Sequence, residues 1–353
     1  MRPIQQLRVV ATALAMAIVA GCGGSPAAVA SPSATPGAAT GASAAAATPA
    51  PALVKLRASY GNITPANLPP FFAKDQGIFQ KHGLDVDLSL ISGGSKSMAA
   101  LLGNSEDIAQ LGGTETMSAA AGGADVVCVA LWVPVSAWTL LGPASYTSPS
   151  DLKGKTIGVA TRGGSAEVAA VQALAKLGLK PTDVSIQATG STANLTAALL
   201  AGQVYAGPGH PPDTSKLFAA GFKVIVDLAK EKVVATDNGT IVTRKYLNAH
   251  RDIVQRYVDA LIEAVAVMKK DKPTTMKVME KLLKVTDQKA LSETYDFYVG
   301  QIFPTYPVPE EAAFKASRDD LSATTPALKN FDVTKVLDRS FVDDARARKV
   351  GGS

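Results

Sequence analysis

The sequence is poor in the residues that build covalent or metal centres. Its 353 residues include only two cysteines and three histidines. Cys128 lies inside the apolar segment 126–131, which favours a small buried hydrophobic residue over a reactive thiol. One cysteine beyond Cys22 cannot form an internal disulfide framework, and three scattered histidines do not predict a metal site.

Catalytic and nucleotide-binding motifs are also missing. Gly154-Lys155-Thr156 resembles the end of a phosphate-binding loop, but Pro149 stands where that loop needs its first glycine. Ser150 and Lys153 match S-x-x-K without the motifs that accompany it in penicillin-binding enzymes. The sequence contains no G-x-S-x-G or H-E-x-x-H, so it predicts neither an enzyme nor a bound cofactor.

Charge of one sign is not concentrated anywhere. The chain has 35 basic and 30 acidic residues, and its net charge of +5 falls to +3 without Arg2 and Arg8. No basic stripe is interleaved with aromatic residues, so we do not expect nucleic acid as a partner. Beyond the first residues, no apolar run is long enough for a membrane span.

The first 22 residues have the pattern of an export signal. Arg2 and Arg8 precede the short apolar run 9–20, which ends in Val19-Ala20-Gly21-Cys22. This order is that of a bacterial lipobox, in which the cysteine is lipid-modified. An ordinary signal peptide that happens to contain a cysteine is the alternative. We therefore predict a lipoprotein signal peptide at 1–21, a lipid attached to Cys22, and a location outside the plasma membrane, in the periplasm or on the outer cell surface.

Composition then divides the rest of the chain. Residues 22–51 are almost entirely Ala, Ser, Pro, Thr and Gly, which predicts a disordered tether. Short apolar strands and amphipathic helices alternate through two halves, and helices alone follow from about residue 245. The expected elements include strands at 54–60, 108–111 and 204–206 and helices at 70–80 and 282–298. This pattern predicts an α/β protein with two lobes of mostly parallel sheet, whose helical C-terminal part packs on the first lobe. The expected ranges are first lobe 52–138, second lobe 139–240, first lobe again 241–345, and flexible tail 346–353.

Several segments carry a resemblance to a known family. They form a helix with a glycine turn, a strand entry and a series of glycine loops, namely Leu68–Phe79, Lys81–Asp87, Ser92–Gly94, Gly112–Thr114, Asp151–Val159 and Ala197–Val204. In their order and spacing they resemble the nitrate/sulfonate/taurine and thiamine-precursor (pyrimidine) group of ABC transporter solute-binding proteins. The resemblance implies the type II periplasmic-binding fold, a small-molecule ligand and an ABC permease as partner. Tyr205 departs from the family pattern, which usually has Asp there.

Three glycine-rich loops are candidates for the binding site. Each leads from a strand into a helix, where ligands bind in open α/β sheets and free backbone N–H groups favour negative charge. The alternative is that these loops only turn the chain. The candidate residues are Ser92, Gly93, Gly94, Gly113, Thr114, Glu115, Arg162, Gly163, Gly164, Ser165, Asn67 and His210.

Four of these residues have alternatives of their own. Arg162 would clamp an anion or lie solvated at the rim. Glu115 would cap its helix or contact a ligand amine or ring nitrogen. Asn67 follows the first strand and would contact ligand or form a turn, and His210 lies in a rigid Gly-His-Pro-Pro loop. Trp138 and Tyr60 would form aromatic walls or pack at the hinge and core.

The predicted function is capture of a small polar or anionic molecule by lobe closure, for delivery to a permease. The ligand classes are sulfonates, nitrate, pyrimidine precursors and aromatic acids; the mild positive charge favours an anion or a polar heterocycle. The alternative is a ligand-sensing lipoprotein that reports to a membrane receptor. We expect a monomer.

Overall fold

The computed structural model describes residues 52–322 and 324–352, which belong to one compact unit. The predicted signal peptide, the lipid site Cys22 and the tether 22–51 lie outside the described residues and stay predictions. Among the residues that are described, no helix is both long and apolar enough to cross a bilayer.

The sheet of the first lobe has five strands. It is formed by β1 (Val54–Tyr60), β2 (Leu84–Leu90), β3 (Ile108–Leu111), β4 (Val126–Val135) and β10 (Val234–Thr243), in the order β2-β1-β3-β10-β4. β1 pairs in parallel with β2 and β3, whereas β10 pairs antiparallel with β3 and β4. β10 alone therefore runs against the other four strands, and the sheet is mostly parallel, as predicted.

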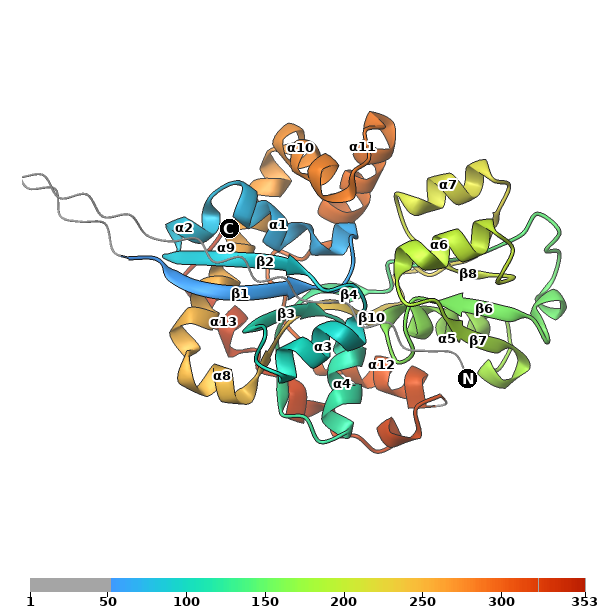
Figure 1. Cartoon of the computed structure of the whole chain (residues 1–353), viewed down its shortest axis with the longest axis horizontal. Coiled ribbons are helices and arrows are strands. Elements are labelled where there is room, and N and C mark those ends of the chain that lie inside the picture. Colours follow the sequence, from blue (N-terminus) through green and yellow to red (C-terminus); the bar gives the residue numbers. More distant parts are fainter. Residues whose placement is uncertain (1–51, 323, 353) are drawn as a thin grey trace, which may run out of the picture. The chain divides into compact units, whose positions relative to one another are not determined.

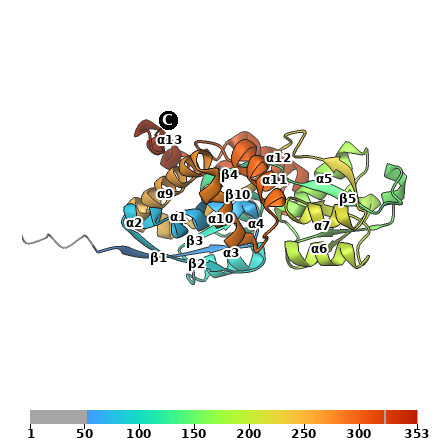
Figure 2. The same cartoon turned by 90° about the horizontal axis from the view of Figure 1, so that it is seen from above.

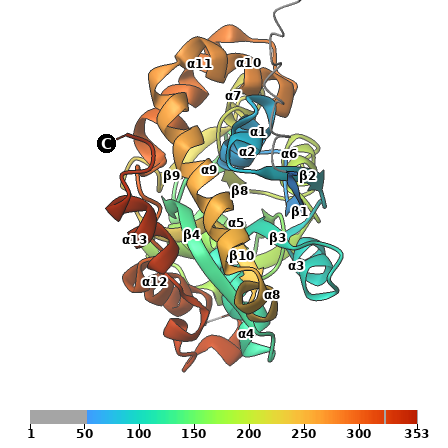
Figure 3. The same cartoon turned by 90° about the vertical axis from the view of Figure 1, so that its left-hand side faces the viewer.

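Helices cover both faces of this sheet. One face carries α1 (Leu68–Asp75), α2 (Ile78–Lys81) and α9 (Arg251–Lys270), and the other carries α3 (Gly94–Leu102), α4 (Gly113–Ala121) and α12 (Glu311–Ser322). Side chains of β4 alternate between the two cores: Val127 and Val129 lie in the first, Val126 and Cys128 in the second. A strand that is covered on both faces has a continuous apolar sequence, as residues 126–131 have. Figure 3 shows α9 crossing its face of the sheet.

The second lobe repeats this plan. Its strands are β5 (Thr139–Gly142), β6 (Thr156–Val159), β7 (Ser185–Ala188), β8 (Gly207–Gly209) and β9 (Lys223–Asp227). β6 and β7 pair in parallel, a parallel bridge joins Ile157 to Ala206 just before β8, and β5 pairs antiparallel with β8 and β9. Helices α5 (Ser165–Lys176), α6 (Thr192–Leu200) and α7 (Asp213–Ala219) surround this sheet (Figures 1 and 2). β5 is thus the single antiparallel strand of this sheet, as β10 is in the first lobe.

The remaining helices complete the first lobe. They are α8 (Arg244–Ala249), α10 (Lys272–Leu283), α11 (Gln288–Phe297) and α13 (Ser340–Ala347). A π-helical turn, Tyr298–Ile302, follows α11, and its Tyr298 and Val299 belong to the core around α9. The helical C-terminal part thus packs back on the first lobe, as predicted, and Arg348 pairs with Asp259 of α9 at 2.7 Å.

Several predicted elements have different boundaries in the structure, and three of them are interrupted or displaced. The helix expected at 70–80 is two helices, because Gly77 between them adopts a left-handed conformation with φ 68°. The helix expected from 282 to 298 is interrupted after Leu283, where Lys284 is left-handed. The strand expected at 204–206 begins later, at Gly207.

The lobes are connected by two chain segments that lie side by side. β4 leads through Ser136–Trp138 into β5, and residues 228–233 lead from β9 into β10. The backbone N–H of Ser136 donates to the carbonyl of Val233 at 2.7 Å, and that of Leu228 donates to the carbonyl of Trp138 at 3.2 Å. Paired crossing strands of this kind can act as a hinge between the lobes.

Candidate ligand-binding site

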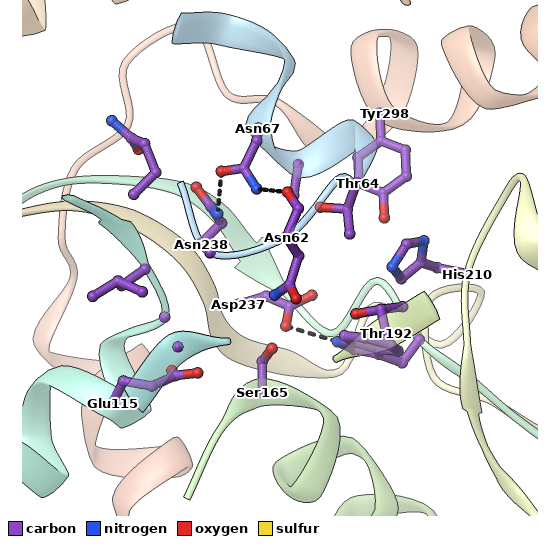
Figure 4. A pocket seen from close by; sticks show the side chains of 17 residues that line it. Asn62, Thr64, Asn67, Glu115, Ser165, Thr192, His210, Asp237, Asn238 and Tyr298 are labelled. Atoms are coloured by element: carbon purple, nitrogen blue, oxygen red, sulfur yellow. Dashed lines mark hydrogen bonds between the residues drawn. The ribbon is translucent and has the colours of Figure 1, made fainter. Parts of the chain in front are cut away.

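A polar cavity of about 40 Å³ lies between the lobes. The first lobe contributes loops after β1 and β3, the start of α3, and Tyr298; the second lobe contributes the start of α5 and of α6, and His210. Trp138 belongs to the first crossing segment, and Asp237 and Asn238 belong to β10. The full lining is Gly61, Asn62, Thr64, Ala66, Asn67, Gly94, Gln110, Leu111, Gly112, Glu115, Trp138, Ser165, Thr192, His210, Asp237, Asn238 and Tyr298 (Figure 4).

The carboxyl group of Glu115 is enclosed by glycines from both lobes. Its oxygens would lie 2.6 Å from a Cβ placed on Gly94, 2.4 Å from one on Gly112 and 2.7 Å from one on Gly164. The Thr114 hydroxyl donates to Glu115 Oε2 at 2.9 Å. Burial raises the pKa of Glu115 to about 7 in spite of this hydrogen bond, and Asp237 raises it further. Only glycines permit so close an enclosure.

Asp237 is the second carboxyl group of the cavity. The Trp138 indole Nε1–H donates to its Oδ1 at 2.7 Å, and the backbone N–H of Ala137 donates to Oδ2 at 3.4 Å. Burial raises the pKa of Asp237, while Trp138, Ser165 and His210 oppose that rise. β10 thus places a carboxyl group in the cavity, and Trp138 of the first crossing segment fixes its orientation.

A chain of amide groups forms the wall beside β10. The Asn67 Nδ2 amide donates to the carbonyl of Asn62 at 2.8 Å, and the Asn238 Nδ2 amide donates to Asn67 Oδ1 at 3.1 Å. A backbone carbonyl can only accept, so the orientation of each amide follows from the one before it. Asn238 Oδ1 is left buried without a partner among the described residues.

Aromatic rings form the rest of the wall. His210 lies between Trp138 and Tyr298, with ring centroids 4.7 Å and 6.2 Å away. His210 Nδ1 lies 2.9 Å from the carbonyl of Pro211. Because that carbonyl can only accept, Nδ1 is the donor of this hydrogen bond.

The structure brings five of the twelve predicted site residues into the lining: Asn67, Gly94, Glu115, Ser165 and His210. Gly93 and Gly164 are not in the lining but lie next to residues that are. A Cβ on Gly164 would be 2.7 Å from Glu115, and a Cβ on Gly93 would be 3.2 Å from the carbonyl of Gly190 in the other lobe. Ser92, Gly113, Thr114 and Gly163 are not in the lining. Whether any of these residues contacts a ligand stays a prediction.

Arg162 and Tyr205 also lie outside the lining. The Arg162 guanidinium pairs with Glu167 at 3.0 Å and donates to the carbonyl of Ile186 at 3.2 Å, and half of its side chain is exposed. The Tyr205 ring lies 5.4 Å from the Lys155 ammonium. The departure from the family pattern at Tyr205 therefore does not alter the lining directly.

Several lining residues were not predicted from the sequence. Thr192 begins α6 after the loop Gly190-Ser191, the same glycine–serine pattern that marked the three predicted loops. Asp237 and Asn238 are polar residues inside a strand, a signal that was available. Tyr298 comes from the π-helical turn far along the chain, and no local pattern places it near the other residues.

The family model described as "NMT1/THI5 like" matches residues 64–274, about three fifths of the chain. The chain belongs to the NMT1/THI5-like family. This finding confirms the resemblance predicted from the glycine loops.

Curated relatives match over shorter stretches. A candidate binding protein of Brucella abortus (strain 2308) is 32% identical over 114 residues, which are 32% of this chain and 35% of that protein. YtlA, a candidate binding protein of Bacillus subtilis (strain 168), is 27% identical over 202 residues, 56% of this chain and 60% of that protein. The chain therefore matches between about a third and three fifths of the length of these relatives.

Solved structures share the fold at low identity. The alkanesulfonate-binding protein SsuA of Xanthomonas axonopodis, bound to MOPS, has a TM-score of 0.69 at 24% identity, covering 82% of this chain and 100% of that one. The nitrate-binding protein NrtA of Synechocystis has a TM-score of 0.69 at 13% identity, covering 85% of this chain and 92% of that one. A third match is a Candida albicans gene product that is described as having the generic periplasmic binding protein fold. Its TM-score is 0.66 at 17% identity, covering 81% of this chain and 97% of that one. These matches confirm the predicted fold.

Proposed function

We propose that the chain is the extracytoplasmic solute-binding component of an ABC importer. It captures a small molecule between its lobes and presents it to a permease in the plasma membrane. The observation that supports this proposal is the position of the cavity: polar groups from both lobes converge beside the two crossing segments. A ligand in this cavity would contact both lobes at once, next to the segments about which the lobes can rotate.

Closure would work through contacts that exist only while the lobes are together. A Cβ on Gly163 would lie 3.4 Å from Ser118 Oγ of the first lobe. On another side of the interface, the Gln172 Nε2 amide of α5 donates to Asp320 of α12 at 2.8 Å. An occupied cavity adds ligand contacts to both lobes and so favours this arrangement. The closed form then offers the permease a surface that the open form lacks, and no bond is made or broken.

The export signal completes the proposal. Lipid on Cys22 would hold the protein at the membrane, and the tether 22–51 would let the lobes reach a permease. We expect labelled fatty acid to be incorporated into the wild-type chain and not into a Cys22→Ala variant. Equal labelling of both chains would contradict the lipid attachment and leave the binding role unchanged.

The binding role is tested on the Cys22→Ala chain. Thermal unfolding with candidate solutes identifies binders, since a ligand at a hundred times its Kd adds about 2.7 kcal/mol of stability. Small-angle scattering then shows whether a binder compacts the protein. We expect compaction, together with loss of uptake of that solute when the gene is deleted. Compaction without any effect on uptake would favour the alternative, a sensory lipoprotein.

A further inference from the structure

The charged groups of the cavity are of one sign. Among its seventeen lining residues are two carboxyl groups, Glu115 and Asp237, and neither a lysine nor an arginine. The only other titratable side chains in the lining are His210 and Tyr298. A sulfonate or nitrate placed here would meet two carboxyl groups with no permanent cation to offset them.

The positions that would suit an anion are already taken by the protein. α3, α4 and α5 all begin at the cavity, and helix N-termini stabilise negative charge. The carboxyl group of Glu115 lies against Gly94, Gly112 and Gly164, which stand at these three helix starts. Glu115 thus occupies the place that a bound anion would take.

Two amide oxygens of the lining are acceptors left for a ligand. The donors of Asn67, Trp138 and Gln110 all make hydrogen bonds within the protein. By contrast, Asn62 Oδ1 and Asn238 Oδ1 are buried without a partner among the described residues, as is the Thr192 hydroxyl, which can accept or donate. A buried acceptor without a donor costs free energy, and a ligand with N–H groups removes that cost.

The aromatic lining has the same preference. Trp138 and Tyr298 are 5% and 1% exposed, and both face the cavity beside His210. The face of an indole or phenol ring attracts a cation, most strongly where water is excluded. Aromatic rings and carboxyl groups together are the usual surroundings of a bound organic cation.

We infer that the site takes a small organic cation with several N–H groups, such as an amidinium or a primary ammonium, with Glu115 and Asp237 as its counter-ions. The inference rests on the proposed binding role and narrows its ligand class. A cavity of about 40 Å³ holds about three water molecules, which suits a compact cationic group entering between the lobes. The raised pKa values of both carboxyl groups agree with a site that lacks its counter-charge.

Two series of probes test the charge without knowledge of the natural ligand. Acetamidinium, acetamide and acetate share one planar shape and carry charges of +1, 0 and −1; benzamidinium, benzamide and benzoate extend the series with a ring. Nitrate and methanesulfonate are added as anions. Binding to the Cys22→Ala chain is measured by thermal shift and calorimetry, and compaction by scattering. We expect affinity to fall from amidinium to amide to carboxylate.

Variants assign the preference to the site. Glu115→Gln keeps the shape and removes the charge, so we expect amidinium to bind about 10- to 100-fold more weakly and amide to change little. Asp237→Asn, which retains an acceptor for Trp138, serves as a second variant if the first does not fold. Glu311→Gln, an exposed carboxyl of α12 paired with Lys315, is the matched control and should leave every affinity unchanged.

The outcomes separate the two proposals. Tighter binding of acetate, nitrate or methanesulfonate, equal affinity across a series, or no binding by any probe would overturn the cationic ligand class. If an anion binds and compacts the protein, the binding role stands and only its ligand class is wrong. If amidinium binds with the expected order but nothing compacts the protein, the ligand class stands and closure is wrong.

Discussion

The first turns of α4 and α5 contain two glutamates in similar positions and different surroundings. Glu115 and Glu167 each follow a pair of glycines at a helix start, one in each lobe. Glu167 is 1% exposed and pairs with Arg162 at 3.0 Å, and its Oε2 accepts from the backbone N–H of Gly163 at 2.6 Å. Among the described residues, Glu115 makes no ion pair with a lysine or arginine, and burial raises its pKa to about 7.

The difference shows which carboxyl group is structural and which is available. A buried carboxylate is stable when its counter-charge is close, and otherwise it takes up a proton. The second lobe supplies the counter-charge of Glu167 from its own chain. The first lobe leaves Glu115 facing the cavity, where a ligand can supply it. Four substitutions would break or sharpen this comparison.

The largest effect is expected from Arg162→Met. The substitution leaves the Glu167 carboxylate buried without its cation, so the free energy of unfolding should fall by about 3 kcal/mol, at the low end for buried pairs because Arg162 is half exposed. Urea denaturation at neutral pH measures this. The Arg57→Met variant, whose pair with Asp107 is more exposed, is the control and should lose about 1 kcal/mol or less. Equal losses would remove the contrast between buried and exposed pairs.

Glu115→Gln is expected to act in the opposite direction. A carboxyl group whose pKa is higher in the folded than in the unfolded chain binds its proton more tightly when folded. Stability is then greatest below about pH 4.5 and declines as the pH rises to about 7. Asp237 adds to the same slope. The variant should be more stable than wild type at pH 8 by about 2 kcal/mol and show a flatter decline. A steeper decline in the variant would contradict the raised pKa.

The glycine enclosure is tested by Gly164→Ala. The new Cβ would lie 2.7 Å from Glu115 Oε1 and 2.4 Å from the Thr161 hydroxyl, so the lobes cannot close as tightly around the carboxyl group. We expect amidinium to bind about tenfold more weakly, which is about 1.4 kcal/mol. Gly300→Ala meets nothing within 4 Å and should bind as wild type does. Unchanged affinity in the first variant would mean that the enclosure relaxes without cost.

The smallest effect is expected from Trp138→Phe. Loss of the indole N–H leaves Asp237 Oδ1 without its donor at 2.7 Å, which should lower stability by about 1 kcal/mol. The loss should shrink when amidinium is bound, because the ligand then satisfies the same oxygen. Thermal unfolding with and without the probe measures both values, and an equal loss in the two conditions would remove Asp237 from the binding site.

Most of the fold could be predicted from local patterns. β1 and β3 begin and end at the predicted residues, because β1 alternates apolar and polar residues and β3 is a short, mostly apolar run before two glycines. β8 was misplaced because its sequence, Gly-Pro-Gly, lacks every residue type that favours strands. The break at Gly77 was missed because the apolar spacing continues across it.

The site could be predicted only in part. Its loops follow from the rule that ligands lie beyond the carboxyl ends of strands, which located Asn67, Gly94, Glu115 and Ser165. The charge of the site could not be predicted, since it depends on which side chains face one another. Arg162 faces Glu167 and lies outside the lining, while Asp237 comes from β10, far along the chain.

The most direct test of the central claim is the pKa of Glu115 measured by carboxyl carbon NMR, with Glu115→Gln used to assign the resonance. In the free protein we expect a value of about 7. With acetamidinium bound, the value should fall well below 7, because the ligand's positive charge stabilises the carboxylate. A value that is unchanged or higher in the complex would show that Glu115 is not the counter-ion of the ligand.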